Sequence, residues 1–391
     1  MPIVPITRLQ FPDKKVLLRC DFNVPLAEGK IQDPARIDAS LDTIRYILEH
    51  GGSAVLCSHL GRPKERTPEL SLKPVAEYLT EVLGQKVRLA PDCVGDHTGK
   101  MVEALKPGEA LLLENLRFHR EEEANDRDFS HELARHKQVY VNDAFGTAHR
   151  AHASTVGVTR FLPERAAGFL MMRELDALRK VTANPQRPLV AIMGGAKVSD
   201  KIGLIKSLLN KVDSILIGGA MAYTFLKAQG IAIGRSRVED DKLELAKELL
   251  AEAARKGVKI VLPSDHIVAT APEAVATPHT VAEIPSDMMG LDIGPQTAAE
   301  FIAEIARAKT VIWNGPLGLF EVPAFAGGTM RVGEALANQP GVISIIGGGD
   351  TAAALAHAPW ASKFTHISTG GGATLEFLEG RELPGVTALE V

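Results

Sequence analysis

The sequence predicts an α/β fold with two doubly wound domains, each built on a parallel β-sheet. The chain has 391 residues, which is more than a single hydrophobic core normally organises. Short apolar runs recur between helical patterns, and runs such as Ile343–Ile346 are continuous rather than alternating. Continuous apolar strands are typical of parallel strands that are covered on both faces. Aromatic residues make up only 5% of the chain and glycines number 35, which favours tight strand-to-helix turns over a β-sandwich.

The apolar runs divide into two sets that are separated by a long helical pattern. Each run is followed by residues with helical spacing, as expected for strands joined by crossover helices. In the first half we predict strands at Lys15–Arg19, Ala54–Ser58, Val87–Ala90, Ala110–Glu114 and Val139–Asn142. In the second half we predict strands at Leu189–Met193, Ser214–Ile217, Lys259–Leu262, Val311–Trp313, Ile343–Ile346 and His366–Ser368.

The segment between the two sets predicts a connecting helix rather than a disordered linker. Apolar residues from Leu170 to Val181 fall at helical spacing, and Pro185 and Pro188 end the pattern. We therefore predict a helix at Ala166–Val181. The expected organisation is an N-terminal domain over residues 1–165, an interdomain helix over 166–182 and a C-terminal domain over 183–372.

Composition excludes several classes of protein and predicts a cytoplasmic one. The net charge of −4 offers no overall positive field for nucleic acid. The three cysteines are too few and too far apart for a disulfide framework or a structural zinc site. The first fifteen residues lack the apolar core of a signal peptide, and no stretch approaches the length of a membrane span.

Cationic side chains follow the predicted strands of the first half. Ligands of parallel sheets bind beyond the carboxyl ends of the strands. Arginine binds phosphate and carboxylate through paired hydrogen bonds, and clustered cations need an anion to neutralise them. One arginine alone would equally fit a surface ion pair, so the prediction of a small, multiply anionic ligand depends on the whole set. The set comprises His59, Arg62, Arg117 and Arg150, with Asp21 and Asn23 expected to orient a hydroxyl group.

Glycines, in contrast, follow the strands of the second half. Glycines between a strand and a helix let backbone N–H groups approach an anion at the helix N-terminus. Lys197 follows one such turn, and Lys201 lies one helical turn later on the same face. Asp350 is a candidate helix cap or Mg²⁺ ligand, whereas Thr351 is expected to be an N-cap. The glycine clusters are Gly194–Gly195, Gly218–Gly219, Gly347–Gly349 and Gly370–Gly372.

One of these clusters supports an alternative function. Gly347, Gly349 and Ala352 fit the dinucleotide pattern G-x-G-x-x-A, but the next predicted strand ends without the acidic residue that would bind a ribose. An NAD-dependent dehydrogenase is therefore one alternative. A bilobal binding protein without catalysis is the second, and it leaves Lys197 and Lys201 unexplained. The sequence contains neither a Walker A motif nor the motifs of protein kinases.

Taken together and in this order, seven strings resemble the 3-phosphoglycerate kinase family of bacterial type. No single string would be specific, but the resemblance runs from about residue 3 to the end of the sequence. The strings are Arg19–Pro25, Ser58–Pro63, Leu113–Phe118, Gly146–His152, Gly194–Lys201, Trp313–Pro316 and Gly347–Asp350.

The resemblance implies roles for individual residues. Arg36, which would otherwise be interpreted as a surface residue at a helix start, is implied to stabilise the transferring phosphoryl group. Lys197, Lys201 and a helix N-terminus at Gly371 and Gly372 are implied to act on the same group. The implied phosphoglycerate site is Asp21, Asn23, Arg36, His59, Arg62, Arg117 and Arg150. The implied nucleotide site is Lys197, Gly218, Asn314, Glu321, Gly348, Gly349, Asp350 and Thr351, with Asp350 contacting Mg²⁺.

The resemblance also implies a reaction and a domain arrangement. The reaction is the reversible, Mg²⁺-dependent transfer of a phosphoryl group from 1,3-bisphosphoglycerate to ADP, giving 3-phosphoglycerate and ATP in glycolysis. Two Rossmann-like domains in a bilobal hinge arrangement are implied, with residues from about 373 to 391 returning to the first domain. We expect a cytoplasmic monomer with small-molecule substrates and no nucleic-acid or membrane partner. Hinge closure around the connecting helix is expected to bring the ligands together and to exclude water.

Overall fold

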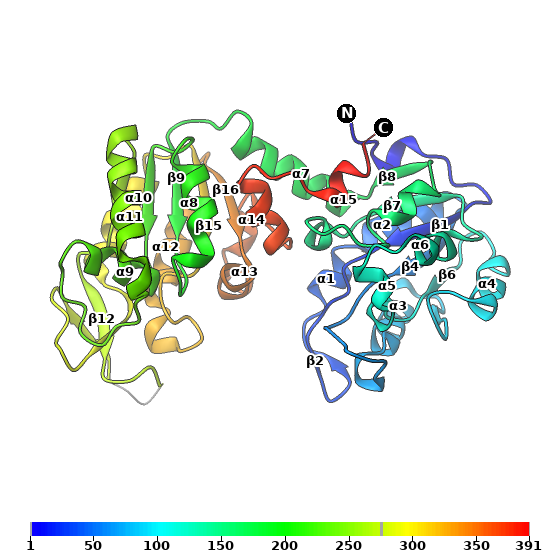
Figure 1. Ribbon diagram of the computed structural model, residues 1–391, viewed down its shortest axis with the longest axis horizontal. Coiled ribbons are helices and arrows are strands. Elements are labelled where there is room, and N and C mark those ends of the chain that lie inside the picture. The colour runs from blue at the N-terminus through cyan, green and yellow to red at the C-terminus, as the bar shows by residue number, and fades with distance from the viewer. Residues whose placement is uncertain (1, 274–276, 391) are drawn as a thin grey trace. The chain divides into compact units, whose positions relative to one another are not determined.

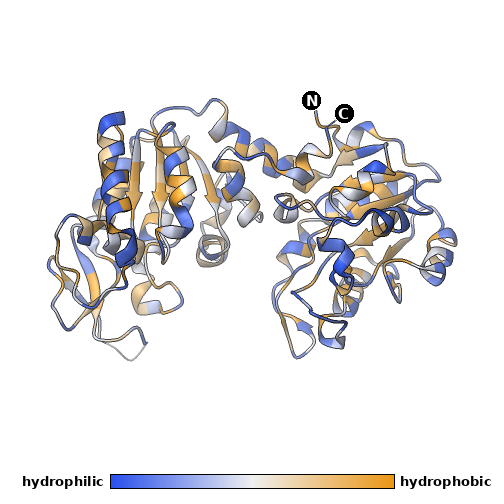
Figure 2. Ribbon diagram, viewed as in Figure 1, coloured by the Kyte–Doolittle hydropathy of each residue, from blue (hydrophilic) through white to orange (hydrophobic). Residues whose placement is uncertain are grey.

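The computed structural model describes residues 2–273 and 277–390, and it divides into two α/β units (Figure 1). Unit 1 runs to Leu175 and takes up the chain again at Glu382, whereas unit 2 comprises Asp176–Arg381. Each unit is built on a six-stranded parallel sheet, which confirms the predicted fold class. Figure 2 shows the hydrophobic strands inside each unit and hydrophilic residues on the outer helical surfaces.

The sheet of unit 1 has the strand order β5-β6-β4-β1-β7-β8, with β1 near its centre. Alternate residues of β1, such as Val16 and Leu18, pack in one core with helices α2 and α3, and the intervening Leu17 is equally buried on the other face. Burial on both faces explains why these strands have no polar alternation. The strands are β1 Lys15–Arg19, β4 Ser53–Cys57, β5 Arg88–Leu89, β6 Ala110–Leu112, β7 Val139–Asn142 and β8 Arg165–Ala167.

Short helices and the C-terminal segment complete unit 1. The backbone N–H of Gly385 donates to the carbonyl of Ala148 (2.8 Å), and Ile3 forms an antiparallel bridge with Glu390. Residues from the two ends of the chain therefore lie side by side (Figure 1). The helices are α1 Ala35–Asp38, α2 Leu41–Glu49, α3 Lys73–Leu83, α4 Asp96–Glu103, α5 Arg120–Glu123, α6 Arg127–Ala134 and α15 Pro384–Thr387, and β2 Leu26–Ala27 pairs with β3 Lys30–Ile31.

The sheet of unit 2 has the order β11-β10-β9-β15-β16-β17. Trp313 and its neighbours on one face pack with α11, α12 and α13, while Ile312 is equally buried on the opposite face. The strands are β9 Leu189–Met193, β10 Ser214–Ile217, β11 Lys259–Val261, β15 Thr310–Asn314, β16 Ile343–Gly347 and β17 His366–Ile367. The helices are α8 Ile202–Leu208, α9 Met221–Ala228, α10 Leu243–Lys256, α11 Pro295–Ile305, α12 Gly327–Ala337, α13 Gly349–Leu355 and α14 Gly372–Leu378.

Several predicted strands differ by one or two residues at their ends, and the short β2–β3 pair was not predicted. Three further features differ more from the sequence prediction. Residues 165–167 form the edge strand β8, so the connecting helix α7 is Phe169–Thr182 and begins later than the predicted Ala166. An antiparallel sheet of β12 His266–Ala269, β13 His279–Val281 and β14 Met289–Ile293 was not predicted. The helix α14 belongs to unit 2, where Ser207 Oγ donates to the carbonyl of Leu378 (3.1 Å), so the segment that returns to unit 1 starts at Glu382 rather than near residue 373.

Across the described ranges, we find no helix that has both the length and the apolar character needed to cross a membrane.

Candidate functional site

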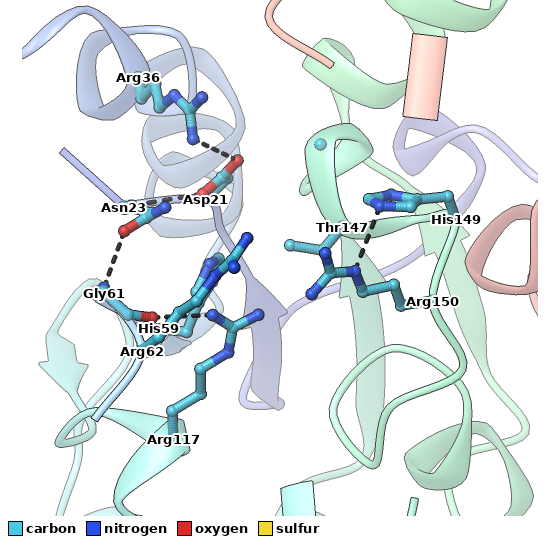
Figure 3. A pocket seen from close by; sticks show the side chains of 11 residues that line it. Asp21, Asn23, Arg36, His59, Gly61, Arg62, Arg117, Thr147, His149 and Arg150 are labelled. Carbon is cyan, nitrogen blue, oxygen red and sulfur yellow. Dashed lines mark hydrogen bonds and ion pairs between the residues drawn. The ribbon is translucent and has the colours of Figure 1, made fainter. Parts of the chain in front are cut away.

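Unit 1 holds a polar cavity of about 230 Å³ at the carboxyl ends of β6, β4, β1 and β7, which are neighbours in the sheet (Figure 3). The loops that follow these strands converge there, as expected for an open parallel sheet. The volume lies below the roughly 300–1,000 Å³ of sites for drug-sized ligands, so the cavity suits a small molecule. It is lined by Asp21, Asn23, Arg36, His59, Gly61, Arg62, Arg117, Gly146, Thr147, His149 and Arg150.

Two asparagines tie the loops of this cavity together. Asn115 Nδ2 donates to the carbonyls of Leu60 (2.8 Å) and Leu70 (2.9 Å), and its Oδ1 accepts from the backbone N–H of Leu60. Asn23 Oδ1 accepts from the backbone N–H of Gly61 (2.8 Å). These bonds hold the loops after β1, β4 and β6 in one arrangement, so their side chains are positioned by buried hydrogen bonds.

The arginines of the cavity differ in how firmly the protein holds them. Arg117 is half-buried, with a side chain that is only 6% exposed, and donates through Nη1 to the carbonyl of Gly61 (2.8 Å); loss of solvent lowers the pKa of its guanidinium. Arg36 pairs with Asp21 (3.2 Å), and Arg150 Nε donates to His149 Nε2 (3.2 Å). Arg62 is exposed. Figure 3 shows these groups around one space, where a multiply charged anion would relieve their mutual repulsion.

Histidines beside these arginines are held neutral. Burial lowers the pKa of His59 well below its ordinary value, and the charges of Arg19, Arg117 and Arg36 lower it further. Burial also lowers the pKa of His152 to about 4, with a further contribution from nearby arginines. The positive charge of the cavity therefore comes from guanidinium groups and changes little around neutral pH.

All seven residues predicted for the first ligand line this one cavity. The sequence prediction missed Gly61, Gly146, Thr147 and His149. His149 had been expected to have only a structural role. Its position directly before Arg150, in a loop after β7, is the signal that could have placed it at the cavity.

In unit 2 a second polar cavity, of about 330 Å³, lies at the carboxyl ends of β9, β15 and β16. Asp350 is exposed at the first turn of α13, and its carboxylate forms no ion pair or hydrogen bond with a described residue. The predicted residues that line this cavity are Lys197, Lys201, Asn314, Gly348, Gly349, Asp350, Thr351, Gly371 and Gly372.

A mostly apolar cavity, also of about 330 Å³, adjoins the polar one and shares Gly195, Ala196, Pro316 and Asp350 with it. Leu291 and Leu319 form part of its wall, and Glu321 and Arg237 supply charge. Arg237 was not predicted. Gly218 lines neither cavity, because the Leu317 side chain lies against it; an added Cβ would be 2.6 Å from that side chain. Gly219 and Ala220 line the apolar cavity instead.

The polar cavity is also shaped by hydrogen bonds between its loops. Lys201 Nζ donates to Asn314 Oδ1, and burial lowers the pKa of this lysine. The Nδ2 of Asn314 is buried without a hydrogen-bond partner among the described residues. Thr351 does not act as the expected N-cap: its Oγ1 accepts from the backbone N–H of Gly315 (2.7 Å), and Gly348 occupies the N-cap position of α13.

Glycine backbones interlock where β9 and β15 end. The N–H of Gly195 donates to the carbonyl of Pro316 (2.8 Å). A Cβ on Gly194 would lie 2.1 Å from that carbonyl oxygen, and a Cβ on Gly315 would lie 2.1 Å from the carbonyl oxygen of Gly194. Only glycine permits this approach of the two loops.

We expect Gly194→Ala to destabilise unit 2 by about 1–3 kcal/mol or more, because the methyl group cannot fit against fixed backbone. Urea unfolding followed by tryptophan fluorescence measures this, since both tryptophans, Trp313 and Trp360, lie in unit 2. Gly327→Ala is the matched control, because its Cβ would meet nothing nearer than 3.9 Å. Equal stability of the two variants would contradict the interlock.

Asp292 is a buried carboxylate near the apolar cavity, and it accepts from the backbone N–H of Gly328 (2.6 Å). Burial raises its pKa from 3.8 to about 7. The folded state therefore holds this proton more tightly than the unfolded state. The resulting stability is complete below about pH 4 and is lost as the pH rises through about 7.

We expect the stability of the wild type relative to Asp292→Asn to fall across this pH window. Denaturant titrations of both proteins at a series of pH values measure the difference. A difference that does not change with pH would show that Asp292 keeps its ordinary pKa in the folded protein.

Comparisons with known proteins agree along nearly the whole chain. A family model described as "Phosphoglycerate kinase" matches residues 6–381. Relatives with that name from Koribacter versatilis and Chloroherpeton thalassium are 56% identical over 395 residues and 55% identical over 386 residues; these alignments cover 98% and 97% of both chains. The solved structure of phosphoglycerate kinase from Coxiella burnetii matches with a TM-score of 0.90 and 41% identity over 99% of both chains. The chain therefore belongs to the phosphoglycerate kinase family of phosphotransferases.

Proposed function

We propose that the chain catalyses the reversible transfer of a phosphoryl group from 1,3-bisphosphoglycerate to ADP, giving 3-phosphoglycerate and ATP. In this proposal the cavity of unit 1 binds phosphoglycerate and the two cavities of unit 2 bind the nucleotide. The observation that carries the proposal is the convergence of four arginines on one small cavity. Among the described residues that line it, Asp21 is the one carboxylate, and it is already paired with Arg36.

The geometry of unit 1 suits a phosphorylated carboxylic acid. Arginine binds phosphate and carboxylate oxygens in paired fashion, and the arginines come from different loops, so they can contact both ends of a three-carbon ligand. We assign Arg62, Arg117 and Arg150 to these anionic groups, and we assign Arg36 to the phosphoryl group that transfers. Asn23 and His59 supply uncharged polar contacts beside them.

The paired cavities of unit 2 suit a nucleoside diphosphate. We assign the purine base to the apolar cavity and Glu321, which lines it, to the ribose. The polar cavity offers lysines and helix N-terminal N–H groups for the phosphates. The unpartnered Nδ2 of Asn314 is a donor that a phosphate oxygen would satisfy. Lys197, Lys201 and the loop at Gly371 and Gly372 are assigned to the transferring group.

The residues of the polar cavity also fit Mg²⁺. Magnesium in phosphoryl-transfer enzymes is held by one or two carboxylates together with substrate phosphates, and Asp350 offers an exposed, unpaired carboxylate at the boundary of both cavities. When bound, the ion would neutralise charge on the nucleotide phosphates. The chain's own groups then align the reacting oxygens and stabilise charge, and this reaction needs no general base from the protein.

A coupled assay of ATP formation from 1,3-bisphosphoglycerate, ADP and Mg²⁺ tests the proposal. Calorimetry with ADP and NAD separates it from the dehydrogenase alternative, which predicts binding of NAD. If the chain forms no ATP in the presence of Mg²⁺, the proposal is overturned. If it also turns over neither set of substrates, the non-catalytic alternative is favoured.

We expect Arg117→Ala to weaken binding of 3-phosphoglycerate by about tenfold to a hundredfold, because a charged hydrogen bond contributes about 1.5–3 kcal/mol. Isothermal titration calorimetry measures the affinity. Arg88→Ala is the matched control, since Arg88 is an exposed arginine of the same unit outside the cavity. If both variants bind like the wild type, Arg117 does not contact the ligand.

Further properties of the proposed function come from the sequence. We propose that the enzyme acts as a cytoplasmic monomer without a nucleic-acid or membrane partner, and analytical ultracentrifugation tests the oligomeric state.

Closure of the two units by a hinge motion around the connecting helix stays a prediction. Small-angle scattering tests it, since closure on binding both ligands would lower the radius of gyration.

A further inference from the structure

Arg19 is a buried cation directly behind the cavity of unit 1, and it has no assigned role in the proposed function. It is the last residue of β1 and is 1% exposed. Its Nε donates to Ser154 Oγ (2.8 Å), its Nη1 donates to the carbonyl of Cys20, and its Nη2 lies 3.2 Å from His59 Nδ1. Burying a guanidinium costs free energy unless it is hydrogen-bonded and neutralised. The partners of Arg19 must therefore offset this cost.

Ser154 connects the charge of Arg19 to a buried carboxylate. The Ser154 hydroxyl donates to Glu122 Oε1 (2.5 Å), and its backbone N–H donates to Glu122 Oε2 (2.9 Å). Both oxygens of Glu122 thus accept hydrogen bonds, as an ionised carboxylate does. Burial raises the pKa of Glu122, whereas the charge of Arg19 and the two bonds from Ser154 act in the opposite direction and favour the ionised form. The hydroxyl accepts from Arg19 and donates to Glu122, so it links the two charges, and the side chains of all three residues are buried.

The bond from Arg19 determines which nitrogen of His59 carries the proton. A guanidinium can only donate, so His59 Nδ1 must present a lone pair to Arg19. A doubly protonated ring would turn an N–H toward Arg19, and the positive charges of Arg19, Arg117 and Arg36 face the ring as well. The remaining state is the neutral ring with its proton on Nε2.

The opposite edge of the ring faces the cavity. His59 is a lining residue, and its Nε2 has no hydrogen-bond partner among the described residues. This nitrogen is not fully buried, so solvent or a ligand in the cavity can reach it.

We propose that Arg19, supported by Ser154 and Glu122, is a positioning residue that fixes His59 as the neutral Nε2–H tautomer, so that this ring offers the cavity a hydrogen-bond donor. The opposite tautomer would offer a lone pair to an anionic ligand, which repels it. Arg19 thereby acts on the ligand through His59 without touching it. This inference rests on the proposed binding of phosphoglycerate in the cavity.

The tautomer can be measured in the unmodified wild-type enzyme. Long-range ¹H–¹⁵N correlation spectra of the full chain labelled with ¹⁵N-histidine distinguish the two tautomers and the imidazolium. His59 is assigned by the loss of its signals in His59→Gln. We expect the Nε2–H pattern at pH 7 and at pH 6. An Nδ1–H pattern, a mixture of tautomers or an imidazolium pattern would overturn the proposal, whatever the activity.

A variant tests the cause. In Arg19→Met we expect mixed tautomers at His59 and a KM for 3-phosphoglycerate that rises about tenfold or more, with a smaller change in turnover. The double variant Arg19→Met/Glu122→Met leaves no unpaired buried charge, so it keeps the test possible if the single variant does not fold. Arg160→Met, an exposed arginine of the same unit, is the matched control and should match the wild type. An unchanged Nε2–H pattern in the Arg19 variants would overturn the role of Arg19.

The two hypotheses fail in different ways. If the wild type makes no ATP from 1,3-bisphosphoglycerate, the proposed function fails, whereas the spectrum still reports the tautomer. If ATP forms normally but the wild-type spectrum lacks the Nε2–H pattern, only the role of Arg19 fails.

Discussion

Replacing Arg36 with alanine is expected to lower the turnover number about 10²–10³-fold, the loss typical when one donor to a transition-state charge is removed. KM for 3-phosphoglycerate should change much less. Arg36 is held at the cavity by Asp21 (3.2 Å) yet its side chain is 39% exposed, so it can reach a phosphoryl group whose charge shifts during transfer. An interaction that strengthens in the transition state raises turnover rather than binding.

Steady-state kinetics with both substrates varied separate these effects. Arg8→Ala removes an exposed arginine of unit 1 outside the cavity and serves as the control. If Arg36→Ala raises KM at unchanged turnover, Arg36 binds the ground state and is not the group that stabilises transfer.

Lys197→Ala should reduce turnover to a similar extent, about 10²–10³-fold. Lys197 is exposed at the polar cavity and has no hydrogen bond or ion pair with a described residue, so the protein does not neutralise its charge. Lys201 cannot replace it, because Asn314 already engages that ammonium group.

Turnover at saturating ADP and 1,3-bisphosphoglycerate measures this effect. Lys206→Ala, which removes an exposed lysine from the nearby helix α8, is the control. Normal turnover of Lys197→Ala would remove this residue from the catalytic set, and an equal loss in both variants would point to a general change in the charge of unit 2.

The sequence was most informative about buried parallel strands. Lys15–Arg19, Val139–Asn142, Leu189–Met193 and Ser214–Ile217 have the predicted bounds, because burial on both faces leaves a continuous apolar run that polar residues, proline or glycine end. Short edge strands were harder. The residues of β8 are Arg165, Ala166 and Ala167, and two alanines beside a helical pattern favour a helix over a strand. The antiparallel sheet of unit 2 was missed because its strands are short and lie in a segment rich in turn residues.

The site of unit 1 was predictable to the extent that its side chains follow strand ends. His59, Arg62, Arg117 and Arg150 follow directly from that rule. Arg36 comes from helix α1, not from a strand end, so only the family resemblance identified it. Neither the rule nor the resemblance reveals the buried hydrogen bonds behind the cavity, since those depend on side-chain packing that sequence spacing does not determine.

The return of residues 382–390 to unit 1 has a consequence for how the protein is made. The ribosome produces these residues only after all of unit 2, although they bridge Ile3 and bond to Ala148. The nascent N-terminal unit must therefore wait through the translation of about 200 residues, roughly 10–40 s at 5–20 residues per second, before its last backbone contacts can form. During that interval the region around Ala148 lacks its covering segment, which makes it a place where a chaperone or a protease would meet the growing polypeptide.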